Sequence, residues 1–241
     1  MTAPQITCAV LSKSLSHNRL AAYSVTSDRD SSDAVARYLW NLALSAAMQP
    51  VLHTLEVAFR NALFDVGNEA TAKSPFSTRI VPSWLDAKPS MLASQEEADV
   101  TEAVQRLGKN PKRHTAGHLV GQLGFWIRLC DSPYEQGRPN GPALWPLAVK
   151  RFPNCPRSER TRVRIRYAFD EVREFRNRLA HHQPIWDTSV LDMHVRAIER
   201  LRWMNARLAA VTQHYSQLVA VYNAGPAAWR HIAESSFVVA D

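Results

Sequence analysis

The spacing of apolar residues along the chain predicts helices almost throughout. Between residues 33 and 66, apolar side chains recur every three or four positions on both sides of Pro50. They are Val35, Leu39, Leu42, Ala46, Leu52, Leu55, Phe59 and Leu63. This period places them on one face of an α-helix. Because proline removes a helical hydrogen bond, we expect two helices here, or one helix kinked at Pro50.

The same period and the capping residues predict the other elements. Further helices are expected over residues 14–23, 94–107, 119–130, 158–182 and 189–224, the last with a kink and ended by Gly225 and Pro226. Residues 66–90 are rich in turn-forming residues and predict a surface excursion anchored by Trp84. The proline-dense residues 131–157 predict a long loop or short turns. We therefore expect an all-α fold, with one domain over residues 14–241 behind a tail at 1–13.

Composition narrows the class of protein. The hydrophobic content of 46% excludes a disordered chain. No run of 18 uncharged apolar residues and no signal peptide occur, so we expect a cytosolic protein that does not span a membrane. Its three cysteines lie far apart and without C-x-x-C spacing, which argues against disulfides and a cysteine zinc site. The formal charge of +7 permits a polyanionic partner.

The stretch EFRNRLAHHQPIW, residues 174–186, concentrates chemistry at the end of an arginine-rich helix. Four apolar residues at steps of four, three and four form a stripe that we expect to face the core: Ala168, Val172, Phe175 and Leu179. After this stripe come Arg176, Asn177, His181 and His182, and then the helix-breaking Pro184. A solvated helix with ion pairs between neighbouring turns explains the arginines but not this cluster.

The positions in this cluster set a geometric condition. Asn177 and His181 are four apart and share a helix face, whereas Arg176 and His181 are five apart, about 140° around the helix. They converge only if the arginine side chain reaches around, if the helix loosens before Pro184, or if a second copy of the chain supplies the partner group.

The residue types in this cluster suit RNA cleavage. An imidazole can take a proton from a ribose 2′-hydroxyl, and a guanidinium binds a phosphate in bidentate fashion, without any metal.

The motif R-N-x-x-x-H at Arg176, Asn177 and His181 resembles the signature of HEPN domains. The string RNRLAHHQPIW, together with SHNRLAAY (16–23), YLWNLALSAAMQPVLHTLEVAFRNAL (38–63) and GHLVGQLGFWIRL (117–129), resembles the Abi-like, or abortive infection, branch of that superfamily. The resemblance implies a helical bundle that acts as a homodimer and cleaves RNA without a metal or cofactor. Its products would be a 2′,3′-cyclic phosphate and a 5′-hydroxyl. It also implies a role in phage defence or as a toxin, with an antitoxin or a small RNA as a further candidate partner.

By this resemblance His181 is the general base, and Arg176 contacts the phosphate and the transition state. Asn177 is the orienting residue, which can fix the imidazole or a phosphate oxygen. His182 is the competing choice for the base. Glu56 and Arg60 are expected to support the site, with Glu56 positioning Arg176, although an ion pair within their own helix is the simpler interpretation. The predicted RNA contacts are Arg173, Arg178, Lys112, Arg113 and Trp186.

Two other functions are compatible with the sequence. The first is a HEPN module that binds RNA or a nucleotide without cutting it, and the second is a structural helical protein with no ligand at this site. A metal protein is disfavoured. His114 and His118 are spaced as helical ligands, but no carboxylate or cysteine near them completes a zinc set.

Overall fold

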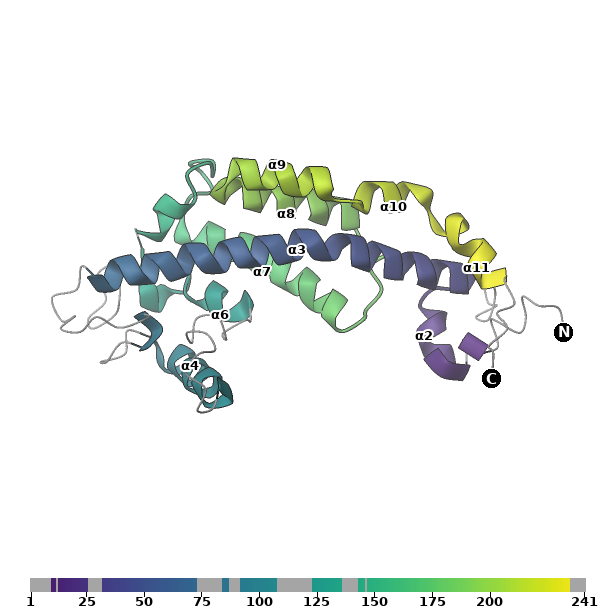
Figure 1. The fold of residues 1–241 in the computed structure, drawn as a ribbon, viewed down its shortest axis with the longest axis horizontal. Helices are drawn as coiled ribbons and strands as arrows, with labels where there is room; N and C mark the ends of the chain where they lie inside the picture. The colour runs from purple at the N-terminus through teal and green to yellow at the C-terminus, as the bar shows by residue number, and fades with distance from the viewer. Residues whose placement is uncertain are drawn as a thin grey trace. The chain divides into compact units, whose positions relative to one another are not determined.

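The structure is a computed structural model, and it describes residues 10–11, 13–25, 32–72, 84–86, 92–107, 123–135, 143–145 and 147–234. These residues form helices joined by turns and loops and contain no strand (Figure 1). The all-α prediction is therefore confirmed for the described part of the chain. The HEPN-type arrangement of the helices stays a prediction.

The helices follow one another in the order shown by the colours of Figure 1. The α-helices are α2 (His17–Ala21), α3 (Ser32–Ala72), α4 (Ser94–Leu107), α6 (Leu123–Arg128), α7 (Arg162–Ala180), α8 (Val190–Met204), α9 (Ala206–Tyr215), α10 (Leu218–Ala224) and α11 (Arg230–Glu234). The 3-10 helices are η1 (Trp84–Asp86), η2 (Ser132–Tyr134), η3 (Ala148–Arg151) and η4 (Pro226–Trp229). The proline-dense residues 131–157 thus include short turns, as predicted.

Contacts divide the chain into two compact units. Unit 1 comprises Met1–Leu52, Phe175–Arg196 and Thr212–Asp241, and unit 2 comprises His53–Glu174 and Ala197–Val211. The boundaries fall inside α3, α7, α8 and α9. The single domain expected over residues 14–241 stays a prediction.

Helix α3 continues through Pro50 without a break (Figure 1). Proline has no N–H, so the carbonyl of Ala46 loses its usual helical partner. Ala46 is exposed, and water can take the place of that partner. The alternative of two separate helices is therefore wrong.

Helix α3 also runs further than its pattern predicted, to Ala72, so the surface excursion expected from residue 66 does not begin there. Gly67 lies inside this extension, where its missing side chain leaves room for the ring of Trp84. A Cβ atom at residue 67 would lie 2.0 Å from that ring. Trp84 is only 1% exposed, which confirms its predicted role as an anchor.

Several predicted helices have other ends in the structure. The helix expected over residues 14–23 includes α2 (His17–Ala21), which Ser16 caps, and the helix expected over residues 119–130 ends at Arg128. Helix α7 begins at Arg162 rather than Ser158, since the Thr161 hydroxyl accepts a hydrogen bond from the N–H of Arg164 (3.3 Å) and caps the helix there. The single kinked helix expected over residues 189–224 is three helices. Asn205 caps α9 by accepting from the N–H of Leu208 (3.0 Å), and a break at Ser216 separates α9 from α10. Gly225, with φ 63°, ends α10 as predicted.

Each unit has its own aromatic and aliphatic core. In unit 2 the ring of Phe59 stacks on that of Phe169 with centroids 3.9 Å apart, and Phe152 packs against both rings. In unit 1 the indole N–H of Trp40 donates to the carbonyl of Val221 (2.9 Å), which ties α3 to α10.

Helix α3 is the one described helix that is long and apolar enough to cross a membrane. Its most apolar window of 18 residues has a mean hydropathy of 1.2, and 33% of that window is buried inside the protein. The central helix of a water-soluble protein has the same length and composition, so this property alone does not indicate a membrane span.

Candidate functional site

The predicted catalytic residues lie together at the carboxyl end of α7, within unit 1. Arg176 and Asn177 are half-buried in the last turns of the helix, and His181 and His182 follow its last residue, Ala180, with exposed side chains. The apolar stripe of α7 is buried as predicted: Ala168, Val172, Phe175 and Leu179. The stripe therefore anchors the helix and leaves the two imidazoles in solvent.

The backbone at the two histidines explains why the helix stops there. The N–H of Gln183 donates to the carbonyl of Arg178 (2.9 Å), and the N–H of His182 donates to that of Leu179 (3.0 Å). This pair of bonds, with His182 in the left-handed region (φ 55°), is the Schellman ending of a helix. Glycine usually occupies the left-handed position. The helix thus ends by an αL turn at His182, two residues before the predicted breaker Pro184.

The two histidines have different backbones. The N–H of His181 still donates to the carbonyl of Asn177 (2.9 Å), which is the helical i to i−4 bond. His181 and Asn177 therefore share a helix face, as predicted. The helix is regular up to His181, so loosening does not bring Arg176 toward it. A long arginine side chain or a second copy of the chain remain as the ways to join them.

Two arginines hold the chain that leaves α7. Arg178 donates from Nη2 to the carbonyl of Pro184 (3.0 Å), and Arg19 of α2 donates from Nη1 to the carbonyl of His182 (2.9 Å). Both are cations near the negative end of the α7 dipole, where positive charge is favourable. Arg178 was predicted to contact RNA. The role of Arg19 was not foreseen, although it lies in the block SHNRLAAY.

The loop after the histidines is fixed by α3. Asn41 is 4% exposed, and its side-chain oxygen accepts from the N–H groups of Ile185 (2.7 Å) and Trp186 (3.1 Å). One buried amide thus satisfies two backbone donors of a loop far along the chain. No pattern in the sequence marks this role, because a single asparagine in an apolar helix has no characteristic spacing.

Trp186 is held at half exposure. Its indole N–H donates to the carbonyl of Ala22 (3.3 Å), and the Arg37 guanidinium carbon lies 5.9 Å from the ring centroid. Arg37 in turn donates to the carbonyl of Tyr23 (3.1 Å). Burial raises the pKa of the Tyr23 hydroxyl to about 12, partly offset by the charge of Arg19, so Tyr23 stays protonated at neutral pH and is no candidate for a base. The choice of a histidine as the base stays a prediction.

The remaining predicted residues belong to unit 2 or lie outside the described ranges. Arg173 donates from Nε to Asp170 (2.6 Å), and Arg60 from Nε to Asn61 (3.4 Å). Glu56 is half-buried on α3. Its proposed effect on Arg176 stays a prediction. Lys112 and Arg113, like the pair His114 and His118, lie outside the described residues.

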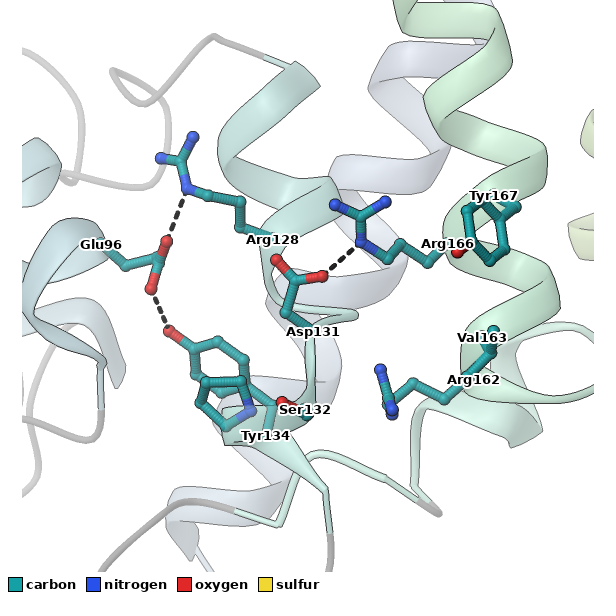
Figure 2. Close-up of a pocket in the computed structure, with 10 residues that line it drawn as sticks. Glu96, Arg128, Asp131, Ser132, Tyr134, Arg162, Val163, Arg166 and Tyr167 are labelled. Carbon is teal, nitrogen blue, oxygen red and sulfur yellow. Dashed lines mark hydrogen bonds and ion pairs between the residues drawn. The ribbon is translucent and has the colours of Figure 1, made fainter.

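Unit 2 contains a pocket of about 540 Å³ that the sequence did not predict (Figure 2). Figure 2 shows Glu96 of α4 between two groups, accepting from Arg128 Nε (2.6 Å) and from the Tyr134 hydroxyl (2.8 Å). Across the pocket Arg166 of α7 donates to Asp131 and to Asp170 (3.4 Å).

The charges in this pocket neutralise one another. Arg128 also pairs with Asp99, and the bond to Asp131 raises the pKa of Arg166 above its ordinary value. Burial raises the pKa of Tyr134 as well, so that hydroxyl stays protonated and continues to donate to Glu96. These guanidinium groups already have carboxylate partners. The pocket is therefore better explained by ion pairs, between α6 and α4 and between α7 and the turn after α6, than as a phosphate site.

The cysteines contribute no reactive centre among the described residues. Cys130 and Cys155 are free and buried, and burial raises the pKa of both thiols, that of Cys155 to about 11. Cys8 lies outside the described residues. Within the ranges that the structure describes, no group of three His, Cys, Asp or Glu side chains could hold a metal ion. The expectation of a metal-free protein stays a prediction.

No protein-family model, curated protein or solved structure matches this chain. The resemblance to Abi-like HEPN proteins therefore remains an expectation from the quoted sequence blocks alone.

Proposed function

We propose that the carboxyl end of α7 is the active site of a metal-independent endoribonuclease of the Abi-like HEPN type. One observation carries the proposal. Arg176, Asn177 and His181 lie at the end of a helix whose apolar stripe is buried, and the imidazole of His181 is exposed to a substrate. Attack by a ribose 2′-hydroxyl needs a general base open to the substrate and a cation that can reach the same phosphate. Here the cation would be Arg176 of the same chain or of a second copy.

The reaction uses the groups as follows. His181 takes the proton of the 2′-hydroxyl, the 2′-oxygen forms a bond to phosphorus, and the bond from phosphorus to the 5′-oxygen breaks. The leaving oxygen takes a proton from an imidazolium or from water. The products are a 2′,3′-cyclic phosphate and a 5′-hydroxyl. Arg176 neutralises the charge that develops on the phosphate, and Asn177, one helical turn before His181, orients the imidazole or a phosphate oxygen.

The backbone favours His181 over His182 as the base. His181 is still in register with Asn177, since its N–H makes the helical bond. His182 occupies the left-handed position of the helix ending, and its carbonyl accepts from Arg19. We assign His182 to the helix ending and His181 to the proton transfer.

RNA is the proposed substrate, and a second copy of the chain is the proposed partner. A dimer brings two sets of Arg176 and His181 to one phosphate, which provides an acid for the leaving group and resolves the separation of the two residues around the helix. Arg178 and the half-exposed Trp186 extend the site toward the adjoining nucleotides. Arg173, Lys112 and Arg113 are proposed as backbone contacts, and Glu56 and Arg60 as supporting residues. An antitoxin or small RNA is the proposed restraint in a cytoplasmic defence system.

The test is cleavage of total cellular RNA by purified protein in EDTA, with analysis of the fragment ends. Arg176→Ala and His181→Ala are expected to abolish cutting. Matched controls are Arg207→Ala, an exposed arginine of α9, and His214→Ala, an exposed histidine in the last turn of α9. Both should cut at the wild-type rate. Folded wild-type protein that binds RNA without cutting it would instead support the non-catalytic binding module. Absence of a salt-dependent interaction with RNA would support the purely structural protein.

A further inference from the structure

The described part of the chain contains two non-glycine residues with positive φ, Ser16 at 71° and His182 at 55°. Both residues are tied to one contact, the hydrogen bond from Arg19 to the carbonyl of His182. Ser16 caps α2, which carries Arg19, and His182 provides the carbonyl to which Arg19 donates. A positive φ is unfavourable for a residue that carries a side chain. Such conformations persist where surrounding structure holds them, and they are concentrated at functional sites.

The start of α2 determines where Arg19 points. The Ser16 hydroxyl accepts from the N–H of Arg19 (3.4 Å), so the arginine lies in the first turn. Leu20, the next residue, is fully buried, and Tyr23 is 1% exposed with its ring edge-on to that of Tyr38 at 5.3 Å. Buried neighbours thus fix the helix backbone, and the guanidinium is left at the surface against the end of α7.

Further bonds join the same two segments. The Trp186 indole donates to Ala22 at the end of α2, and Arg37 of α3 donates to Tyr23 while lying near the face of the Trp186 ring. The chain of α2 and the chain after α7 are therefore connected at both ends of the loop, by Arg19 at His182 and by Trp186 at Ala22. The Arg19 contact is the one that reaches the histidines.

We infer that Arg19 is a positioning residue for the histidine pair at the end of α7. Its guanidinium holds the His182 carbonyl, which keeps His182 in the left-handed conformation and fixes the direction in which the adjoining His181 imidazole projects. The inference rests on the proposed nuclease function for its catalytic consequence, although the contact itself is independent of that function. Arg19 acts through the backbone of His182 and not on the substrate.

The experiment combines spectra without RNA and kinetics with RNA. In protein with isotope-labelled histidine, the NMR signals of the His181 and His182 rings are assigned by single substitutions. The signals are then compared in wild type, Arg19→Ala and Arg19→Lys. Arg230→Ala is the matched control, since Arg230 is an exposed arginine of unit 1 whose ion pair is to Asp33. We expect Arg19→Ala to shift and broaden both histidine signals, Arg19→Lys to restore them in part, and the control to leave them unchanged.

In the cleavage assay, Arg19→Ala is expected to lower kcat by about tenfold to a hundredfold and to change KM little, as a misplaced reacting group does. Arg19→Lys should recover part of kcat. Unchanged histidine signals in a folded Arg19→Ala protein would overturn the inference, and so would a rise in KM with unchanged kcat, which would make Arg19 a substrate contact. If wild-type protein cuts no RNA, the proposed function fails, and the histidine spectra alone decide whether Arg19 positions the pair.

Discussion

Replacing His182 by glycine should stabilise the protein relative to replacing it by alanine. Both substitutions remove the same imidazole, so the comparison isolates the effect of a Cβ atom at φ 55°. The left-handed conformation costs alanine about 1–2 kcal/mol, whereas glycine adopts it freely. Glycine loses about 0.5–1 kcal/mol more than alanine in ordering the unfolded chain. From the middles of these two ranges, the difference should be about 0.75 kcal/mol in favour of His182→Gly.

Urea unfolding followed by circular dichroism measures this difference, and thermal unfolding should place the glycine variant about 2 °C above the alanine variant for a chain of this size. The control is the same comparison at the neighbouring residue, His181→Gly against His181→Ala. His181 retains the helical bond to Asn177, so there alanine should be more stable than glycine, by up to about 1 kcal/mol. An alanine variant at 182 as stable as the glycine variant would refute the left-handed helix ending.

Three further predictions concern packing, the loop and pH. Gly67→Ala should destabilise the protein by about 1–3 kcal/mol, because its Cβ would overlap the Trp84 ring. Gly124→Ala is the control and should not destabilise it, since the nearest neighbour of its Cβ is an arginine side chain at 3.6 Å. The urea midpoints of the two variants test this difference. Asn41→Ala should cost about 1–3 kcal/mol, since it leaves two backbone N–H groups of the loop after α7 without their acceptor, and faster amide exchange at those groups should accompany the loss. Burial lowers the pKa of His194 in the folded protein below its ordinary value of 6.5. The free energy of unfolding is therefore undiminished above pH 6.5, and it falls at lower pH, down to the folded pKa, because the unfolded chain takes up a proton first. His194→Gln should flatten the dependence of unfolding free energy on pH in that window, and an unchanged slope would exclude the effect.

Local patterns in the sequence predicted the helices well where a period and a cap coincide. Helix α4 was predicted with its observed bounds, and the buried stripe of α7 follows from steps of three and four. Prediction failed where solvent exposure or a contact with a distant residue determines the local structure. Pro50 suggested a break, but the freed carbonyl is at an exposed residue, and Gly67 suggested a loop, but it makes room for Trp84.

The candidate site was predicted in its residue types and only partly in its geometry. The string RNRLAHHQP indicates the catalytic groups and a helix end, but the left-handed turn falls on His182, where a glycine would normally mark it. The contacts that hold the site come from residues far away in sequence, with a sequence separation of 163 for Arg19 and His182 and of 144 for Asn41 and Ile185. Periodicity describes neighbours along one helix and carries no information about such pairs.

The most direct test of the proposed active site is single-turnover RNA cleavage in EDTA by His181→Ala beside His182→Gly. The glycine substitution fits the observed backbone, so it removes one imidazole while preserving the helix ending. We expect His182→Gly to cut at close to the wild-type rate and to leave cyclic-phosphate ends, and His181→Ala to be inactive although folded. Equal cutting by both variants, or an inactive His182→Gly beside an active His181→Ala, would contradict the assignment of His181 as the base.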